Sequence, residues 1–196
     1  MKRMLVLLLA CLLLASSAAP ASGEPAAEIL PAYTYTGEDP LEEAILSVLQ
    51  TEDYAGRYYT EPGSVMIPCP LFLKTEMTGN GRATVYCSVW LMNYVKQGTT
   101  LVNISGGENP LVITLEKTDG VWQVTALEEA GEGDDYYEDI TRFAGGDEEL
   151  ENKYHEAADL MANEETRTRY IRAYVKASGL DITAYQDYGW DPVELN

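Results

Sequence analysis

The sequence predicts an α+β protein in which an N-terminal helix packs on an antiparallel meander sheet of four or five strands, followed by C-terminal helices. Three observations support this prediction. Apolar residues at helical spacing follow Asp39. Strand-like segments are then joined by the hairpin signals Asn80-Gly81 and Asp119-Gly120. Helical spacing returns only after the last of these strands.

The first 21 residues have the order of a secretory signal peptide. A basic start (residues 1–3) precedes an apolar run of twelve residues (4–15), and small residues follow up to Ala21. The run is shorter than the roughly 20 residues that a membrane-spanning helix needs. Cleavage is expected within residues 19–22, which predicts a secreted or cell-surface protein. The alternative is a lipoprotein anchored through Cys11, because Leu8-Leu9-Ala10-Cys11 resembles a lipobox.

Residues 22–38 show no periodicity and predict a flexible leader, after which residues 39–196 form a single domain. Asp39 is a good N-cap, Pro40 suits the first helical position, and Glu42 occupies the capping-box position. The apolar stripe predicts a helix that ends near Gln50. Residues 51–70 are rich in glycine and proline and predict turns.

Residues 71–127 predict the sheet. Strands are expected at 71–77, 82–95, 100–105, 111–118 and 121–127, with a break at Gly106–Pro110. A two-residue turn at Asp119-Gly120 would pair Lys117 with Trp122, Leu115 with Val124 and Ile113 with Ala126. Trp122, Ile113, Leu115 and Val124 are therefore expected in the core, on the one apolar face of the sheet. Such a face needs a cover of helices.

Residues 131–196 predict an acidic loop, two helices and a tail. The run 128–139 holds seven carboxylates and no basic residue, and it predicts an exposed connection. In the first helix, Leu150, Tyr154, Ala157, Ala158 and Met161 share one face. In the second, Asn163 can act as N-cap, Tyr170, Ile171, Tyr174 and Val175 are apolar, and Ser178-Gly179 ends the helix.

Composition and charge exclude several function classes. The formal net charge is −19, and a nucleic-acid protein needs a basic face to release counterions, so no nucleic-acid partner is expected. The same charge disfavours anionic lipid. His155 is the only histidine, which excludes a metal site with two histidines. The acidic run lacks the spacing of a calcium loop. The sequence thus predicts no cofactor and no metal, and no membrane span.

Three further groups of residues have both a structural and a functional interpretation. Cys69 and Cys87 are either a disulfide or, given the apolar face around Cys87, two buried thiols. Arg167, Arg169, Arg172 and Lys176 lie on one helix, and surface ion pairs are favoured over an anion site. Tyrosines are abundant, 14 against two phenylalanines, and they either border the core or form a binding face.

The tail is aromatic, with Tyr185, Tyr188 and Trp190. We expect it to dock on the domain, and if it were free these three residues would be the candidate partner-binding motif. No catalytic residue is predicted. The sequence favours a noncatalytic module that binds an extracytoplasmic ligand or protein.

The order of a helix followed by strands with the pattern Ile113–Val124 resembles the secreted cystatin-like and NTF2-like domains of bacteria, over about residues 39–130. The tail pattern Ile182–Val193 resembles that of uncharacterised exported proteins and sensor ectodomains of Gram-positive bacteria. The resemblance implies a bent sheet that wraps the N-terminal helix. It also implies the alternative function, a small NTF2-like enzyme that uses pocket carboxylates and tyrosines. Such enzymes commonly place an Asp-His pair in the pocket, and this sheet contains no histidine.

Overall fold

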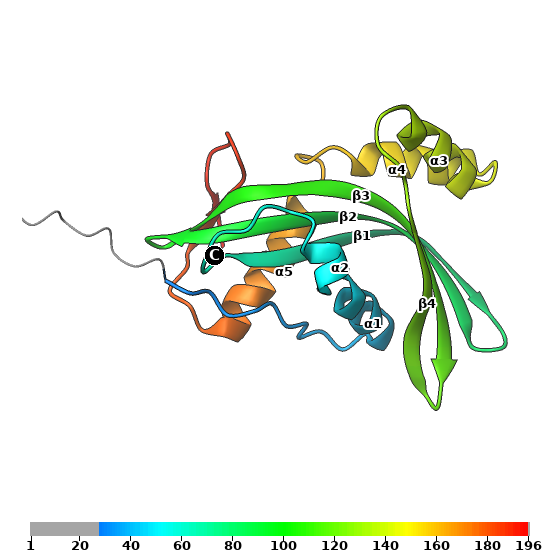
Figure 1. The fold of residues 1–196 in the computed structure, drawn as a ribbon, viewed down its shortest axis with the longest axis horizontal. Coiled ribbons are helices and arrows are strands. Elements are labelled where there is room, and N and C mark those ends of the chain that lie inside the picture. The colour runs from blue at the N-terminus through cyan, green and yellow to red at the C-terminus, as the bar shows by residue number, and fades with distance from the viewer. Residues whose placement is uncertain (1–27, 196) are drawn as a thin grey trace, which may run out of the picture.

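The computed structural model describes residues 28–195, so the predicted signal peptide and the alternative lipid anchor at Cys11 lie outside the described residues. The predicted α+β class is confirmed (Figure 1). The helices are α1 (Pro40–Leu49), α2 (Glu52–Ala55), α3 (Asp134–Ala144), α4 (Glu148–Ala157) and α5 (Glu164–Ser178). The strands are β1 (Val65–Thr78), β2 (Arg82–Gln97), β3 (Thr100–Thr118), β4 (Val121–Glu129), β5 (Ala184–Gln186) and β6 (Val193–Glu194).

The sheet is mixed, whereas the sequence predicts a purely antiparallel one. Strands β1 to β4 pair antiparallel in chain order, but β5 pairs parallel with the start of β3, at Thr100–Val102. Strand β4 pairs with the other end of β3, from Leu111 to Thr118. One edge of the long strand β3 therefore holds β4 at one end and the C-terminal tail at the other (Figure 1).

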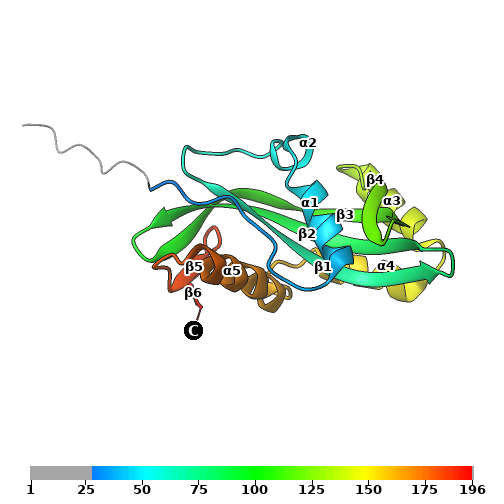
Figure 2. The ribbon, with the colours of Figure 1, turned by 90° about the horizontal axis from the view of Figure 1, so that it is seen from below.

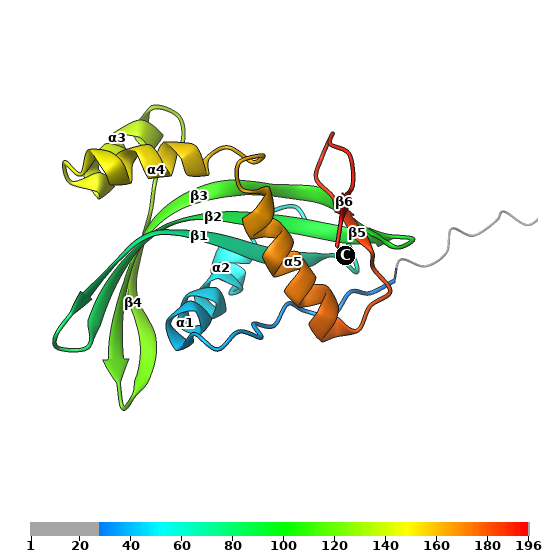
Figure 3. The same ribbon diagram turned by 180° about the vertical axis from the view of Figure 1, so that it is seen from behind.

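Helices cover both faces of the curved sheet. Figure 2 shows α1 and α2 on one face and α5 on the other, and Figure 3 shows α5 crossing the sheet. Successive side chains of β2 point to opposite faces of the sheet. Val85, Cys87 and Val89 face the α1 side together with Leu111 and Ile113, to which β2 is paired. This accounts for the near-continuous burial of β2, which is unusual for a strand with one wet face.

Of the two interpretations of Cys69 and Cys87, this alternation excludes the disulfide. Cys69 is opposite Trp90 in the β1–β2 ladder, and Trp90 lies on the opposite face of β2 from Cys87. Cys69 and Cys87 are therefore on different sides of the sheet, and both are buried free thiols.

Helix α1 begins after the N-cap Asp39, whose carboxylate accepts a hydrogen bond from the Leu41 N–H at 2.9 Å. The predicted capping box is wrong. Instead of Glu42, the Tyr35 hydroxyl accepts from the Asp39 N–H, at 3.3 Å. The described part of the predicted leader packs on the domain and is not free. Leu30 and Tyr33 are buried, and the Leu30 N–H donates to the Gly63 carbonyl.

Strand β3 runs through Gly106–Pro110, where the sequence predicts a break. An added Cβ at Gly106 would lie 2.3 Å from the Leu91 carbonyl oxygen, so only glycine allows β2 to approach here. The Pro110 carbonyl accepts from the Ala130 N–H, on the side of β4. In an antiparallel strand, the N–H and C=O of one residue point to the same edge. At position 110 this edge faces β4, so the N–H that Pro110 lacks costs no hydrogen bond to β2.

The β3–β4 hairpin has the predicted register only near its turn. Lys117 pairs with Trp122 and Leu115 with Val124, as predicted. A bulge at this point then pairs Ile113 with Leu127 in place of Ala126. Ile113, Leu115 and Trp122 are buried, whereas Val124 is half-buried and only packs against the core.

The acidic run 128–139 is not a loop. It comprises the end of β4, a short turn and the first half of α3. In the second half of α3, Ile140 and Phe143 are buried. These side chains pack with Leu150 and Tyr154 of α4 in a separate small core. Helix α4 ends at Ala157, so Ala158 and Met161 lie beyond it and are exposed. Within residues 28–195, no helix combines the length and apolar character needed to cross a membrane.

Candidate functional site

The three aromatic residues of the tail do not share one environment. Tyr185, in β5, is fully buried, packs edge-on against Tyr94, and shares a 2.8 Å hydrogen bond with the Thr168 hydroxyl of α5. Tyr188 and Trp190, in the loop between β5 and β6, are 86% and 49% exposed. The prediction of a docked tail is therefore correct for Tyr185 and wrong for the other two aromatic side chains.

A buried ion pair fixes the base of the β5–β6 hairpin. Asp187 accepts hydrogen bonds on one oxygen from Arg167 Nε at 3.2 Å and Nη2 at 2.7 Å, and on the other oxygen from the Tyr94 hydroxyl at 2.8 Å. The Arg167 and Asp187 side chains are only 2% and 4% exposed. Arg167 also donates to the Leu160 carbonyl. The loop that carries Tyr188 and Trp190 is thus attached at its first residue to α5 and β2.

The prediction that Arg167 makes a surface ion pair is wrong. Position 167 lies four residues before Ile171 and three before Tyr170, on the buried face of α5. Asn163, one turn earlier, is also buried, and its amide donates to the Ala157 and Asp159 carbonyls in place of capping α5. This helical spacing is the signal in the sequence that could have placed Arg167 inside.

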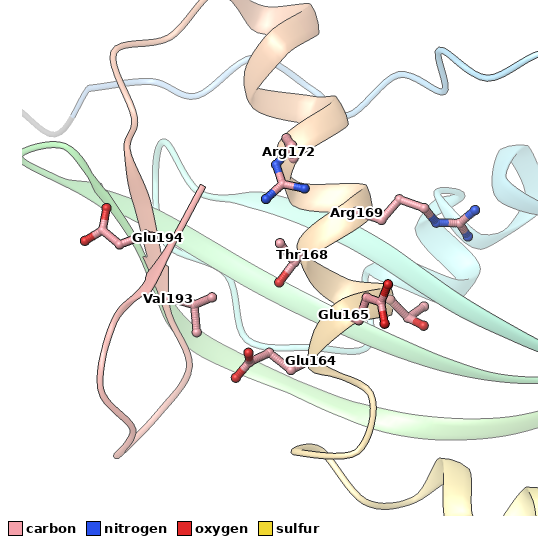
Figure 4. A pocket seen from close by; sticks show the side chains of 8 residues that line it. Glu164, Glu165, Thr168, Arg169, Arg172, Val193 and Glu194 are labelled. Carbon is pink, nitrogen blue, oxygen red and sulfur yellow. The ribbon is translucent and has the colours of Figure 1, made fainter. Parts of the chain in front are cut away.

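A groove of about 590 Å³ lies between α5 and β6 (Figure 4). Val193 faces Thr168 across its middle, with Glu164 at one end and Arg172 at the other. Arg169 points away from β6, toward the other side of α5. The groove is therefore charged at its two ends, with the uncharged side chains of Val193 and Thr168 between them.

A second hollow of about 370 Å³ adjoins this groove through Glu164 and Val193. Its other lining residues are Met161, Arg167, Asp187, Trp190, Asp191 and Pro192. The buried ion pair forms its floor, and Trp190 and the exposed Met161 flank its opening. We call the exposed tip of the β5–β6 loop (188–191), Met161 and the two hollows the hairpin surface.

Carboxylates dominate the charge of the hairpin surface. Glu164, Glu165, Asp191 and Glu194 line the two hollows, and within residues 28–195 none of them lies within salt-bridge distance of a basic side chain. Arg172 lines one end of the groove, and among the described residues it has no carboxylate within 4.0 Å. The hairpin surface therefore combines the exposed side chains of Met161, Tyr188 and Trp190 with an excess of carboxylates.

The two cysteine thiols within residues 28–195 are buried and protonated. Burial raises the pKa of the Cys69 and Cys87 thiols, which therefore stay neutral near neutral pH. His155 is exposed on α4, beside the Tyr137 ring. Among residues 28–195, no three histidine, cysteine, aspartate or glutamate side chains gather to hold a metal ion.

One carboxylate is strongly desolvated. Burial raises the pKa of Glu108, although hydrogen bonds from the Ser88 hydroxyl at 2.5 Å and the Tyr136 hydroxyl at 3.0 Å favour its charged form. Ser88 is on β2 and Tyr136 on α3, so Glu108 connects α3 to the sheet. Glu108 does not line any of the cavities described above or below.

The chain matches no protein-family model, and it shows no significant similarity to a curated protein or to a solved structure. The resemblance to cystatin-like and NTF2-like domains therefore stays a prediction.

Proposed function

We propose that this protein is a noncatalytic exported module that binds a partner protein through the hairpin surface. The observation that carries the proposal is the exposure of Tyr188 and Trp190 on a loop whose base is fixed by the buried Arg167–Asp187 pair. Soluble proteins rarely expose large neighbouring aromatic residues unless they bind something. Tyrosine and tryptophan are also the residues that contribute most binding energy in interfaces. The predicted signal peptide supports export.

The partner that fits this surface is a basic segment with an apolar side chain. The unpaired carboxylates of the hairpin surface would attract lysine or arginine, and the exposed side chains of Met161, Tyr188 and Trp190 would contact the apolar group. Because the loop is fixed at its base, a partner would order little of it on binding, which lowers the entropic cost of association.

The noncatalytic part of the proposal rests on the state of the reactive groups. The alternative, an NTF2-like enzyme, needs a carboxylate or phenol that changes protonation inside a pocket. Glu108 has a raised pKa but lines none of the cavities described above, and the thiols are buried. Tyr35 and Tyr170, which share a pocket with the Glu42 carboxylate, have raised pKa values and stay protonated near neutral pH. The bent sheet with α1 on one face is compatible with the NTF2-like resemblance, which we retain as a proposal about the fold family.

Peptide selection tests the proposed function. Random peptides displayed on phage are selected against the protein and against Tyr188→Ser/Trp190→Ser. Tyr137→Ser is the control, because Tyr137 is an aromatic residue of α3 whose exposure, 64%, lies between those of Tyr188 and Trp190. We expect basic–apolar peptides from the unaltered protein and from Tyr137→Ser. The double variant should bind the selected peptides at least about tenfold more weakly in fluorescence anisotropy. Equal binding by all three proteins, or selection of acidic peptides, would contradict the proposal.

A further inference from the structure

A third cavity, separate from the two hollows of the hairpin surface, lies on the other side of α5 from the groove and has a volume of about 390 Å³. It is formed by the segment 33–39, the first turn of α1 and the middle of α5. These elements meet beyond the free edge of β1, since α1 and α5 cover opposite faces of the sheet (Figure 2). The lining residues are Tyr33, Tyr35, Thr36, Gly37, Glu38, Asp39, Glu42, Arg169, Tyr170 and Ala173. We call this the tyrosine pocket.

Glu42 is the carboxylate of the tyrosine pocket, and two tyrosines hold it in place. The Tyr35 hydroxyl donates to Oε2 at 3.1 Å, and the Tyr170 hydroxyl donates to Oε1 at 2.5 Å. The Glu42 side chain is only 13% exposed. Each oxygen of an ionised carboxylate offers two acceptor sites, so each still has one free after these bonds. The carboxylate is thus oriented and still able to accept from a ligand.

The ring of Tyr170 already has a cation beside it. The Arg169 guanidinium lies 4.5 Å from the centroid of the Tyr170 ring, and it donates to the Tyr170 hydroxyl at 2.7 Å. It is 4.0 Å from Glu42 Oε1, and its side chain is 62% exposed. A cation over an aromatic ring and beside a carboxylate is stabilised by both groups. The pocket has its volume of about 390 Å³ with Arg169 in this position.

We propose that the tyrosine pocket binds a small organic ammonium cation, with the tyrosine rings around the cationic group and Glu42 as its counter-ion. The charges of the lining favour a cation, since Glu38, Asp39 and Glu42 are opposed only by Arg169. Aromatic rings combined with a carboxylate are the usual recognition elements for ammonium groups. The volume lies within the range of about 300–1,000 Å³ found for small-molecule sites. This site is independent of the hairpin surface.

The tyrosines of the pocket keep their hydroxyl protons, so none of them adds a negative charge to the proposed site. Burial raises the pKa of Tyr33, and burial together with the neighbouring Glu42 raises the pKa of Tyr170. Burial also raises the pKa of Tyr35. Near neutral pH all three are therefore neutral phenols, and Tyr35 and Tyr170 donate their hydroxyl protons to Glu42. Tyr33 is further fixed by stacking on Tyr174 at 6.3 Å.

The experiment compares a cation with its neutral isostere. Choline and 3,3-dimethyl-1-butanol have the same shape and differ in the positive charge, and each is titrated into the protein while NMR signals of labelled tyrosines are followed. We expect choline to shift the signals of Tyr33, Tyr35 and Tyr170, and to bind at least about tenfold more tightly than the alcohol. Equal binding of the two, or no shift up to about 100 mM choline, would overturn the proposal; so would a preference for acetate.

Substitutions of the charged residues test whether choline binds in the tyrosine pocket. Glu42→Gln should weaken choline binding about tenfold, whereas Glu43→Gln, which removes the same charge from an exposed position one residue away, should not. Arg169→Gln removes the competing cation, so binding should be retained or tightened. Weaker binding in Arg169→Gln, or equal loss in Glu43→Gln and Glu42→Gln, would contradict the assigned site.

Two further comparisons determine which kind of ammonium compound the pocket binds. Ethanolamine in place of choline distinguishes a primary from a methylated ammonium group. Phosphatidylcholine vesicles distinguish a lipid headgroup from a free small molecule, because they present the same cation on a membrane. The choline–alcohol comparison is made on the unaltered protein, so it decides the proposal even if a variant fails to fold.

Discussion

A single arginine explains how the C-terminal tail is joined to the rest of the chain. Arg167 and Asp187 are both buried, and Tyr94 completes the hydrogen bonding of the carboxylate. Two charges inside a protein are tolerated only when they are paired and hydrogen-bonded, and both conditions hold here. The pair therefore specifies where the tail docks more than it adds to the overall stability.

We predict that Asp187→Ala lowers the free energy of unfolding by about 3–5 kcal/mol, because it leaves Arg167 buried without its partner. Urea unfolding followed by circular dichroism measures the loss. Asp181→Ala, at an exposed position of the same segment, is the control and should change little. The double variant Arg167→Met/Asp187→Leu should recover most of the stability. If Asp187→Ala unfolds at the same urea concentration as the unaltered protein, the pair is not formed in solution.

At the scale of elements, the start of α1 and the Asp119-Gly120 hairpin turn were readable from the sequence, because they depend on neighbouring residues. Asp39 caps α1, and the Asp119-Gly120 turn has the predicted pairing beside it. The course of β3 was not readable, because glycine and proline break an isolated strand. Gly106 and Pro110 are tolerated only because β2 approaches closely and the Pro110 edge faces β4. The acidic start of α3 was misjudged for a related reason, since Ile140 and Phe143 become buried only against α4.

Glu108 gives the attachment of α3 a dependence on pH. A carboxyl group whose pKa is higher in the folded than in the unfolded state stabilises the fold at pH values below its unfolded-state pKa. That contribution is lost as the pH rises through the folded-state pKa. We therefore predict that Glu108→Gln gains stability relative to the unaltered protein as the pH rises from about 4 to 7. The comparison removes the opposite contributions of Asp139 and Asp147, whose pKa values are lowered and which both proteins contain.

Thermal unfolding of the two proteins across this pH range measures the difference. Glu138→Gln, on the exposed side of α3, is the control, and its difference from the unaltered protein should vary little with pH. A difference for Glu108→Gln that is constant, or that shrinks as the pH rises, would show that Glu108 is not desolvated.

At the scale of the whole molecule, the sequence predicted the α+β class and named Tyr188 and Trp190 of the hairpin surface, but it predicted neither the two hollows beside them nor the tyrosine pocket. Both regions join segments that are distant in the chain: Glu42 meets Tyr170, and Arg167 meets Asp187. Periodicity shows which face of a helix is buried, but not which partner covers it. The surplus of tyrosines was a usable signal, since Tyr33, Tyr35 and Tyr170 form one pocket and Tyr185 and Tyr188 belong to the tail.

The tail completes the sheet, so its removal should affect the whole molecule. Truncation after Leu180 removes β5 and β6, exposes the β3 edge at Thr100–Val102, and leaves Arg167 unpaired. It also removes the buried side chains of Ile182 and Tyr185. We predict that the thermal midpoint falls further than in Asp187→Ala, because apolar burial worth about 25 cal/mol per Å² is lost as well as the ion pair.

Adding Arg167→Met to the truncated chain separates these two causes. The substitution removes the unpaired charge but cannot restore the burial of Tyr185, so the midpoint should rise by part of the loss and no more. Calorimetry of the full chain, the truncated chain and the truncated Arg167→Met chain gives the comparison. Full recovery would mean that the tail contributes only a counter-ion for Arg167. An unchanged midpoint in the truncated chain itself would mean that the tail is free in solution, and Tyr185 would then join Tyr188 and Trp190 as an exposed aromatic residue available to a partner.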